Sequence, residues 1–342
     1  MSMRPKLIVA LAATAWAFAV PSLAADQALI DAAKKEGSVT WYTTLVVNQV
    51  VQPIKQGFEE KYGITLNFAS APWQETSFRI INEGKAQATK ADVFDSLPAF
   101  AAINAAGLVQ PYISGAAKDY DPAYKEPTGL WTANIIQPVT PAFNTEMVPA
   151  SGAPHAYADL LDPKWAGKMA WSNSPSIGGP PGFIGGVLSA MGDEKGMDYL
   201  HKLAAQKIAN IPSNPRVVLD RAISGENPLV LAIYNYHAEI SKNQGAPVDW
   251  IKMEPVVAHV GLVALTKGAP HPNAGKLLID YILSDEGAKV MADAGYIPTD
   301  KNVKSSAPAL TPGDNYKIFL VTPEIYEKKI ADWTKIYDDL FK

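Results

Sequence analysis

The sequence has no cysteine among its 342 residues, so no disulfide can form within it. A chain of this length without disulfides has to be stabilised by core packing, as in a large exported bacterial domain. An excess of charge of either sign is also missing, since 30 Lys and Arg stand against 34 Asp and Glu and give a net charge of −4. A mildly acidic chain does not favour nucleic acid as a partner.

Long apolar runs are absent after the first residues. The one such run, Leu7–Val20, follows Arg4 and Lys6 and precedes the small residues Pro21–Ala24. This order is typical of a cleaved secretory signal peptide, which we assign to residues 1–24. The run is short for a helix that crosses a bilayer, so we predict a periplasmic protein without membrane insertion. The remaining chain is long enough for two domains.

Motifs of nucleophilic and metal chemistry are absent as well. No two of the five histidines have the spacing of a zinc site, and neither a Gly-x-Ser-x-Gly elbow nor a phosphate-binding loop occurs. His237 near Glu239 is the best acid–base candidate, but residues two apart on a helix do not face one another. We therefore expect no enzyme, no cofactor and no resident metal; an exported hydrolase or lyase is the weakest alternative.

Strands and helices alternate along the chain, which predicts an α/β fold. Strands Val39–Thr44 and Ile64–Phe68 flank a helix from Val50 to Tyr62, which indicates a parallel pair. The extended run Leu130–Val139 leads into a second α/β set, and the long strand Val256–Leu265 returns the chain to the first. The other expected helices are Gln27–Lys35, Gln74–Ala88, Ser96 to Gly107, Ala156–Leu161, Phe183–Met191, Glu194–Ala205, Arg216–Ser224, Pro272–Gly295 and one in the tail. The other expected strands are Ala91–Asp95, Lys168–Ser172, Leu229–Tyr234 and Val248–Met253.

Hydroxyl side chains gather where predicted strands end. Lys168–Gly185 is predicted as strand, loop and helix, with Ser172, Ser174 and Ser176 in the loop. Free N–H groups at a helix start can bind a small anion or polar ligand, although an ordinary capped connector has the same pattern. Ligands of open α/β sheets lie beyond the carboxyl ends of strands. The serines, with Thr43, Thr44 and an N-cap at Ser96, therefore predict a hydroxyl-lined binding site.

Aromatic residues and one arginine complete the candidate binding residues. Tyr234 and Tyr236 follow a strand, where they can donate to a ligand, stack on it, bind a hard cation as phenolates, or simply pack. Arg216, in the turn that follows Ser213, can pair with an anionic group or remain solvated. Trp73 and Trp171 can form the walls of a pocket or belong to the core.

Six strings, distributed over nearly the whole mature chain, match a known family in order and spacing. They are Glu36–Thr44, Ala91–Ser96, Asp159–Lys168, Ser224–Glu226, Gly268–Ala274 and Leu283–Gly287. In these the chain resembles periplasmic solute-binding proteins of ABC importers (extracellular solute-binding family 1), in the two-crossover class related to ferric-iron-binding proteins. The resemblance implies a type II fold, in which two α/β lobes joined by hinge strands close on a small ligand. We expect lobe 1 in residues 25–135 and 256–303 and lobe 2 in 136–255 and 304–342.

The resemblance also implies the partners and two classes of ligand. A monomer would present its closed form to a membrane permease with a cytoplasmic ATPase, while a chemoreceptor adaptor would differ mainly in its partner. Ferric members hold iron through adjacent tyrosines with a histidine and a carboxylate, whereas here the pair is interrupted as Tyr234-Asn235-Tyr236 or half replaced by His237. Relatives that take up organic anions, phosphorylated ones included, use hydroxyls and backbone amides. A small anionic organic solute is therefore our first prediction, and ferric iron on Tyr234, Tyr236 and His237 is the alternative.

Overall fold

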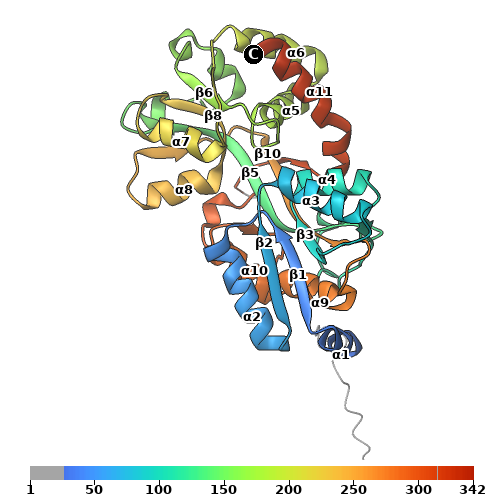
Figure 1. Cartoon of the computed structure of the whole chain (residues 1–342). Helices are drawn as coiled ribbons and strands as arrows, with labels where there is room; N and C mark the ends of the chain where they lie inside the picture. The colour runs from blue at the N-terminus through green and yellow to red at the C-terminus, as the bar shows by residue number, and fades with distance from the viewer. Residues whose placement is uncertain (1–26, 314) are drawn as a thin grey trace, which may run out of the picture.

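The protein is described from a computed structural model, which covers residues 27–313 and 315–342. The proposed signal peptide, residues 1–24, lies outside them. Two lobes stand one above the other, and two long strands run from one lobe into the other (Figure 1). Within the described ranges, no helix combines the length and the apolar character needed to span a bilayer.

Lobe 1 is built on a parallel set of strands. Strand β1 (Ser38–Thr43) pairs in parallel with β2 (Thr65–Ser70) on one side and with β3 (Val93–Asp95) on the other. This confirms the predicted β-α-β unit, whose crossover helix is α2 (Gln52–Tyr62). The other helices of this lobe are α1 (Gln27–Glu36), α3 (Trp73–Lys85), α4 (Leu97–Ala105), α9 (Pro272–Ile282) and α10 (Asp285–Asp293).

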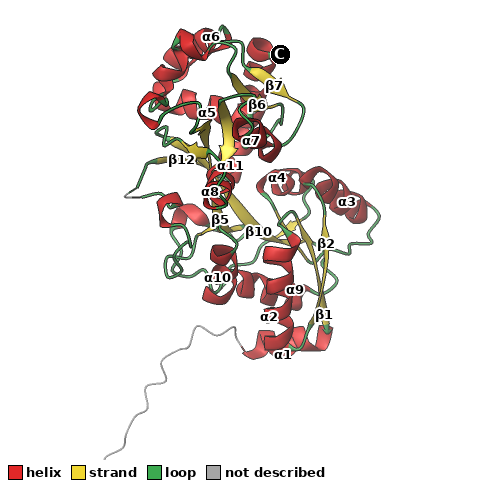
Figure 2. Cartoon of the chain, turned by 90° about the vertical axis from the view of Figure 1, so that its left-hand side faces the viewer, coloured by secondary structure: helices red, strands yellow, loops and turns green. Residues whose placement is uncertain are grey.

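Lobe 2 repeats this plan. Strand β6 (Met169–Ser172) pairs in parallel with β7 (Ala209–Ile211) and with β8 (Leu229–Tyr234). Figure 2 shows β6 and β7 in this upper lobe and β1 and β2 in lobe 1 below it. The helices of this lobe are α5 (Pro180–Met191), α6 (Asp193–Ala204), α7 (Pro215–Ile223) and α8 (Asn235–Asn243).

Two antiparallel hinge strands join the lobes. Strand β5 (Thr132–Asn144) pairs with β10 (Val256–Thr266) from Val139↔Val257 to Thr132↔Val263. Strand β10 pairs with β3 in lobe 1 and β5 pairs with β8 in lobe 2, giving one sheet of order β2-β1-β3-β10-β5-β8-β6-β7. The predicted crossings at residues 130–139 and 256–265 thus correspond to real hinge strands. The shorter strands β4 (Val109–Gln110), β9 (Val248–Trp250), β11 (Ile297–Pro298) and β12 (Ile318–Val321) pair beside them.

A few predicted elements differ from the observed ones. The expected helix Ala156–Leu161 is a short 3-10 helix that ends before Pro163, because proline disfavours helical backbone in the preceding residue. The expected helix Pro272–Gly295 is two helices, and the Ser284 hydroxyl caps the second by accepting a hydrogen bond from the Gly287 N–H. Ser96 precedes α4 as predicted, but its side chain makes no capping hydrogen bond.

The C-terminal helix α11 (Pro323–Phe341) touches both lobes. It packs against α5 and α6 of lobe 2 and also against α4 of lobe 1. Near its start, the Trp131 indole donates a 2.9 Å hydrogen bond to Glu324. The sequence predicts this tail only as part of lobe 2, since helical periodicity identifies an apolar face but not what that face contacts.

Candidate functional site

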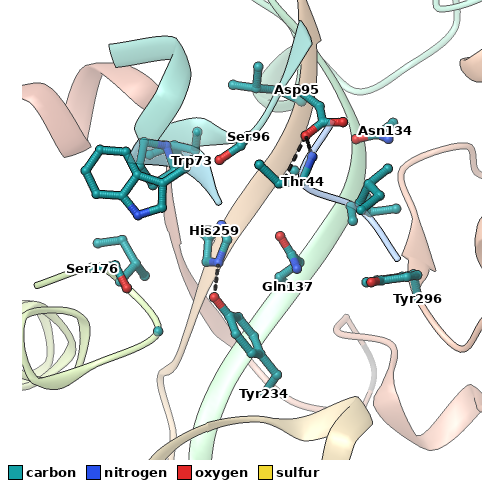
Figure 3. Close-up of a pocket in the computed structure, with 18 of the residues that line it drawn as sticks. Thr44, Trp73, Asp95, Ser96, Asn134, Gln137, Ser176, Tyr234, His259 and Tyr296 are labelled. Atoms are coloured by element: carbon teal, nitrogen blue, oxygen red, sulfur yellow. Dashed lines mark hydrogen bonds between the residues drawn. The ribbon is translucent and has the colours of Figure 1, made fainter. Parts of the chain in front are cut away.

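A cavity of about 350 Å³ opens between the lobes, over the hinge strands. Figure 3 shows Asp95, Ser96 and Trp73 entering it from lobe 1, Gln137 and His259 from the hinge, and Ser176 and Tyr234 from lobe 2. The hinge pair follows from strand register, because Gln137 on β5 lies opposite His259 on β10. Both lobes and the hinge therefore supply polar groups to one space.

Half of the predicted binding residues line this cavity. They are Thr44, Trp73, Ser96, Ser176, Tyr234 and Tyr236, and the alternative iron ligand His237 joins them. They come from turns that follow β1, β2, β3, β6 and β8, as the carboxyl-end rule leads one to expect. Turns that are far apart in the sequence thus come together around the cavity.

The other six predicted residues lie outside the cavity. The buried hydroxyls of Thr43 and Ser172 accept hydrogen bonds from the Leu45 and Ser174 N–H groups within their own turns, and Ser174 bonds to Ser176. Trp171 is wholly buried in the core of lobe 2. The residues concerned are Thr43, Trp171, Ser172, Ser174, Ser213 and Arg216.

Arg216 belongs to α7 and does not line the cavity. Its guanidinium makes a 2.7 Å ion pair with Asp220, one helical turn further along α7. Its positive charge still reaches His237, where it adds to burial in lowering the pKa of the imidazole to about 4. Arg216 therefore affects the site through the electrostatic effect of its charge on His237, and not through contact with the cavity.

Several polar residues of the cavity were given no binding role from the sequence. Asp95 stands beside the predicted Ser96, and Tyr296 comes from the turn after α10. Asn134, Gln137 and His259 belong to the two hinge strands. The sequence does carry a signal for these three residues. A polar residue inside an otherwise apolar, buried strand indicates that its side chain forms a hydrogen bond there.

The His259 imidazole connects the hinge to lobe 2. Its Nδ1 lies 3.2 Å from the Val260 carbonyl oxygen, which can only accept, so Nδ1 carries the proton. Nε2 is then free to accept from the Tyr234 hydroxyl at 3.2 Å. Burial raises the pKa of Tyr234 and lowers that of His259 to about 4, so both are neutral at pH 7.

The turn before α5 carries backbone N–H donors beside the cavity that have no hydrogen-bond acceptor among the described residues. Gly179 donates to the Ser176 carbonyl at 3.0 Å, which closes a tight turn. Within the described ranges, the N–H groups of Ile177 and Gly178 have no acceptor, and both residues line the cavity. Together with the Ser176 hydroxyl, they form a small donor cluster at the positive end of α5.

Comparison with known proteins identifies the chain. The family model described as bacterial extracellular solute-binding protein matches residues 88–318. The chain belongs to this family. It is the solute-binding component of an ABC importer, as the sequence predicted.

Solved structures of similar fold confirm the two-lobed architecture. Iron-bound HitA from Pseudomonas aeruginosa is 21% identical, with a TM-score of 0.74 over 89% of this chain and 99% of that one. AfuA from Actinobacillus pleuropneumoniae, with fructose-6-phosphate bound, is 23% identical, with a TM-score of 0.72 over 89% and 98%. An uncharacterised Haemophilus influenzae protein is 24% identical over 306 residues, 85% of this chain and 86% of its own length. Likeness at this level establishes the fold and does not select the solute.

We expect acid to destabilise this solute-binding protein through His259. The pKa of about 4 in the folded chain lies below the usual 6.5, so the unfolded chain takes up the proton first as the pH falls. From pH 7.5 to 4.5 this group should remove about 2.5 kcal/mol from the free energy of unfolding. Asp95 acts in the opposite direction between pH 6 and 3.8, because burial raises its folded pKa to about 6.

The contribution of His259 is isolated by comparing wild type with His259→Gln in urea unfolding at both pH values. The variant should lose less stability than wild type on acidification. Equal losses in the two proteins would contradict the assignment of a buried, neutral imidazole.

Proposed function

We propose that this protein captures a small organic solute with an anionic group in the interlobe cavity and passes it unchanged to a permease. We further propose that it does so as a periplasmic monomer after removal of residues 1–24. The observation that carries the proposal is the lining of the cavity, in which hydroxyl, amide and N–H donors from both lobes surround about 350 Å³. Such a volume, with apolar walls and a few convergent polar groups, suits a small molecule.

The anionic group would be bound by neutral donors. Among the described residues that line the cavity, none is Lys or Arg. The donor cluster at the start of α5, formed by the Ser176 hydroxyl and the N–H groups of Ile177 and Gly178, has the chemistry that anions seek. Trp73 offers a flat apolar wall on the opposite lobe.

Binding from both lobes gives the solute a way to drive closure. A ligand shifts a conformational equilibrium only by its difference in affinity for the two states. A solute that touches Thr44 and Ser96 on lobe 1 and Ser176 on lobe 2 gains its full set of contacts only when the lobes are closed. The closed form would then be the one that the permease receives.

Ferric iron is the second candidate, because Tyr234 and Tyr236 both line the cavity with their rings stacked 5.5 Å apart. Three features favour the organic solute over it. Burial raises the pKa of both phenols, whereas iron needs phenolates, and the Tyr234 hydroxyl is already engaged with His259. A single ion with its ligands would also leave much of the cavity unfilled.

A thermal-shift screen of the mature protein tests the proposal. The panel contains carboxylates, phosphate esters, sugars, amino acids and ferric citrate. A true ligand at a hundredfold excess over its Kd should add about 2.7 kcal/mol to the stability of the folded chain. We expect the largest shift from one class of organic anion, a reduced shift in Ser176→Ala, and an unchanged one in Ser213→Ala.

Two other outcomes would overturn the proposal. A shift with ferric citrate alone, accompanied by a tyrosinate–iron colour that Tyr234→Phe abolishes, would assign the site to iron. Conversion of the bound solute, followed by mass spectrometry over hours, would show an enzyme.

A further inference from the structure

Two buried polar side chains at the lobe 1 end of the cavity lack partners. Asp95 and Asn134 are each 3% exposed and both line the cavity. Within the described part of the chain, the Asp95 Oδ2 atom and both terminal atoms of the Asn134 amide make no hydrogen bond. Buried polar groups are normally satisfied, so three unpartnered atoms in one place point to a missing ligand.

The sheet brings these two residues together. Asp95 ends β3 and lies opposite Val263 of β10. On the other side of β10, Asn134 of β5 falls where the β5–β10 register shifts between Gly261 and Leu262, so that it has no opposite residue. A bulge of this kind redirects side chains, and Figure 3 shows Asp95 and Asn134 at the same end of the cavity.

Among the described residues, one oxygen of the Asp95 carboxylate makes hydrogen bonds and the other makes none, although the Thr43 hydroxyl and the Trp41 indole lie near the carboxylate and lower its pKa. Its Oδ1 accepts hydrogen bonds from the Thr44 N–H at 2.8 Å and from the Thr44 hydroxyl at 2.7 Å. These bonds orient the side chain and leave Oδ2 for another donor. Because no Lys or Arg among the described residues lines the cavity, this buried carboxylate has no cationic partner there.

Ser96 adds an independent sign of function at the same place. Its backbone has φ +85°, in the region that favours glycine, and its position directly after Asp95 puts its hydroxyl among the cavity-lining groups. A side chain kept in a strained backbone conformation is characteristic of binding sites. An ammonium group has three N–H donors, and the oxygens of Asp95, Asn134 and Ser96 provide three acceptors.

We infer that Asp95 and Asn134 bind an ammonium group of the solute, so that the substrate is bipolar: its ammonium end lies at lobe 1 and its anionic end at the donor cluster before α5. The anionic half rests on the function proposed above, while the ammonium half rests on Asp95, Asn134 and Ser96. The ammonium group of the solute then supplies the positive charge that pairs with the Asp95 carboxylate.

The ionisable groups facing this site make the inference testable by pH. Tyr296 faces Asp95 from the turn after α10, and burial raises its pKa to about 12. Burial likewise raises the pKa of Tyr234 and Tyr236 and lowers those of His237 and His259 to about 4. Among the described residues that line the cavity, Asp95, with a pKa of about 6, is thus the group that changes its charge between pH 5 and 8.

Paired probes that differ only in the amine provide the experiment. Calorimetry at pH 7.5 compares phosphoethanolamine with ethyl phosphate, 4-aminobutyrate with butyrate, and ethylamine as the amine alone. We expect each amine-bearing anion to bind at least about tenfold more tightly than its matched control, with this preference lost in Asp95→Asn and reduced at pH 5. Asp293→Asn, the same change at an exposed residue of α10, should keep the preference.

Asn134→Asp is the second variant, since it replaces the amide with a negatively charged carboxylate of nearly the same shape. It should increase the preference for the amine, which keeps the inference falsifiable if Asp95→Asn does not fold. Equal binding of paired probes, or a preference that survives Asp95→Asn in folded protein, would overturn the inference and leave the proposed function standing if the anions bind. Binding of ethylamine without any anion would overturn the proposed function instead, and binding of no probe would overturn both.

Discussion

Replacing Trp171 with alanine is expected to lower the free energy of unfolding by about 3–5 kcal/mol. Trp171 is fully buried, and its ring makes edge contacts with Phe183 at 5.9 Å and with Phe341 at 4.9 Å between centroids. Truncation leaves a large cavity that the rigid surroundings of β6, α5 and α11 can fill only in part. Urea unfolding measured by far-UV circular dichroism gives the value.

A lost hydrogen bond adds to the cavity. The Trp171 indole donates to the Asn210 Oδ1 at 2.8 Å, an oxygen that also accepts from the Tyr337 hydroxyl at 2.7 Å. The side-chain amide of Asn210 in turn donates to the Phe341 carbonyl. Trp171 thus helps to fasten the end of α11 to β6 and β7, so we expect the variant to loosen that helix first.

Trp73→Ala is the matched control, because Trp73 is a partly exposed tryptophan on the cavity wall. It should weaken solute binding and change the stability only slightly, whereas folded Trp171→Ala should bind solute as wild type does. Loss of affinity in Trp171→Ala at full stability would contradict a purely structural role for this residue.

Replacing Gly178 with alanine is expected to weaken solute binding by about tenfold to hundredfold, which corresponds to the 1–3 kcal/mol typical of an overpacked site. A Cβ at this position would stand 2.6 Å from the Tyr234 hydroxyl and 2.9 Å from its ring carbon Cζ. The tyrosine or the turn has to move, and either movement disturbs the Tyr234–His259 hydrogen bond and the donor cluster before α5. Titration calorimetry with the ligand found in the screen measures the effect.

Gly115→Ala controls for the general effect of an added methyl group. No heavy atom lies within 4 Å of a Cβ built at Gly115, and its backbone is not in the left-handed region. This variant should bind and unfold as wild type does. If Gly178→Ala bound solute equally well, the turn before α5 would not be a binding element.

Most elements of the fold were predictable because their signals are local. Strand β1 ends where Thr43 and Thr44 follow its apolar run, and Gly63, with φ +68°, ends α2. The hinge strands were predicted from their length and apolar character. Strands β7 and β12 and helix α8 were missed, because a strand of three or four residues and a short helix with a mixed pattern have little periodicity to detect.

The candidate site was predictable only in part. Turns at strand ends predicted that Thr44, Ser96, Ser176 and Tyr234 lie near one another, and all four line one cavity. The same rule also suggested Thr43 and Ser172, and Trp171 was suggested as a pocket wall, but all three side chains are buried in the protein. Successive residues of a strand face opposite sides of the sheet, so a shift of one position separates a cavity residue from a core residue.

The sequence by itself determined the alternation of strands and helices and the family, since these depend on composition and on the order of motifs along the chain, and it predicts an export signal at residues 1–24. Only the tertiary structure decided which polar groups meet. Asp95 in β3, Asn134 in β5 and His259 in β10 lie up to 164 residues apart in the sequence. They come together because of the strand register and of one bulge in the β5–β10 pair. The physical reason is that burial, strand pairing and side-chain direction are properties of the assembled sheet, and no local pattern specifies them.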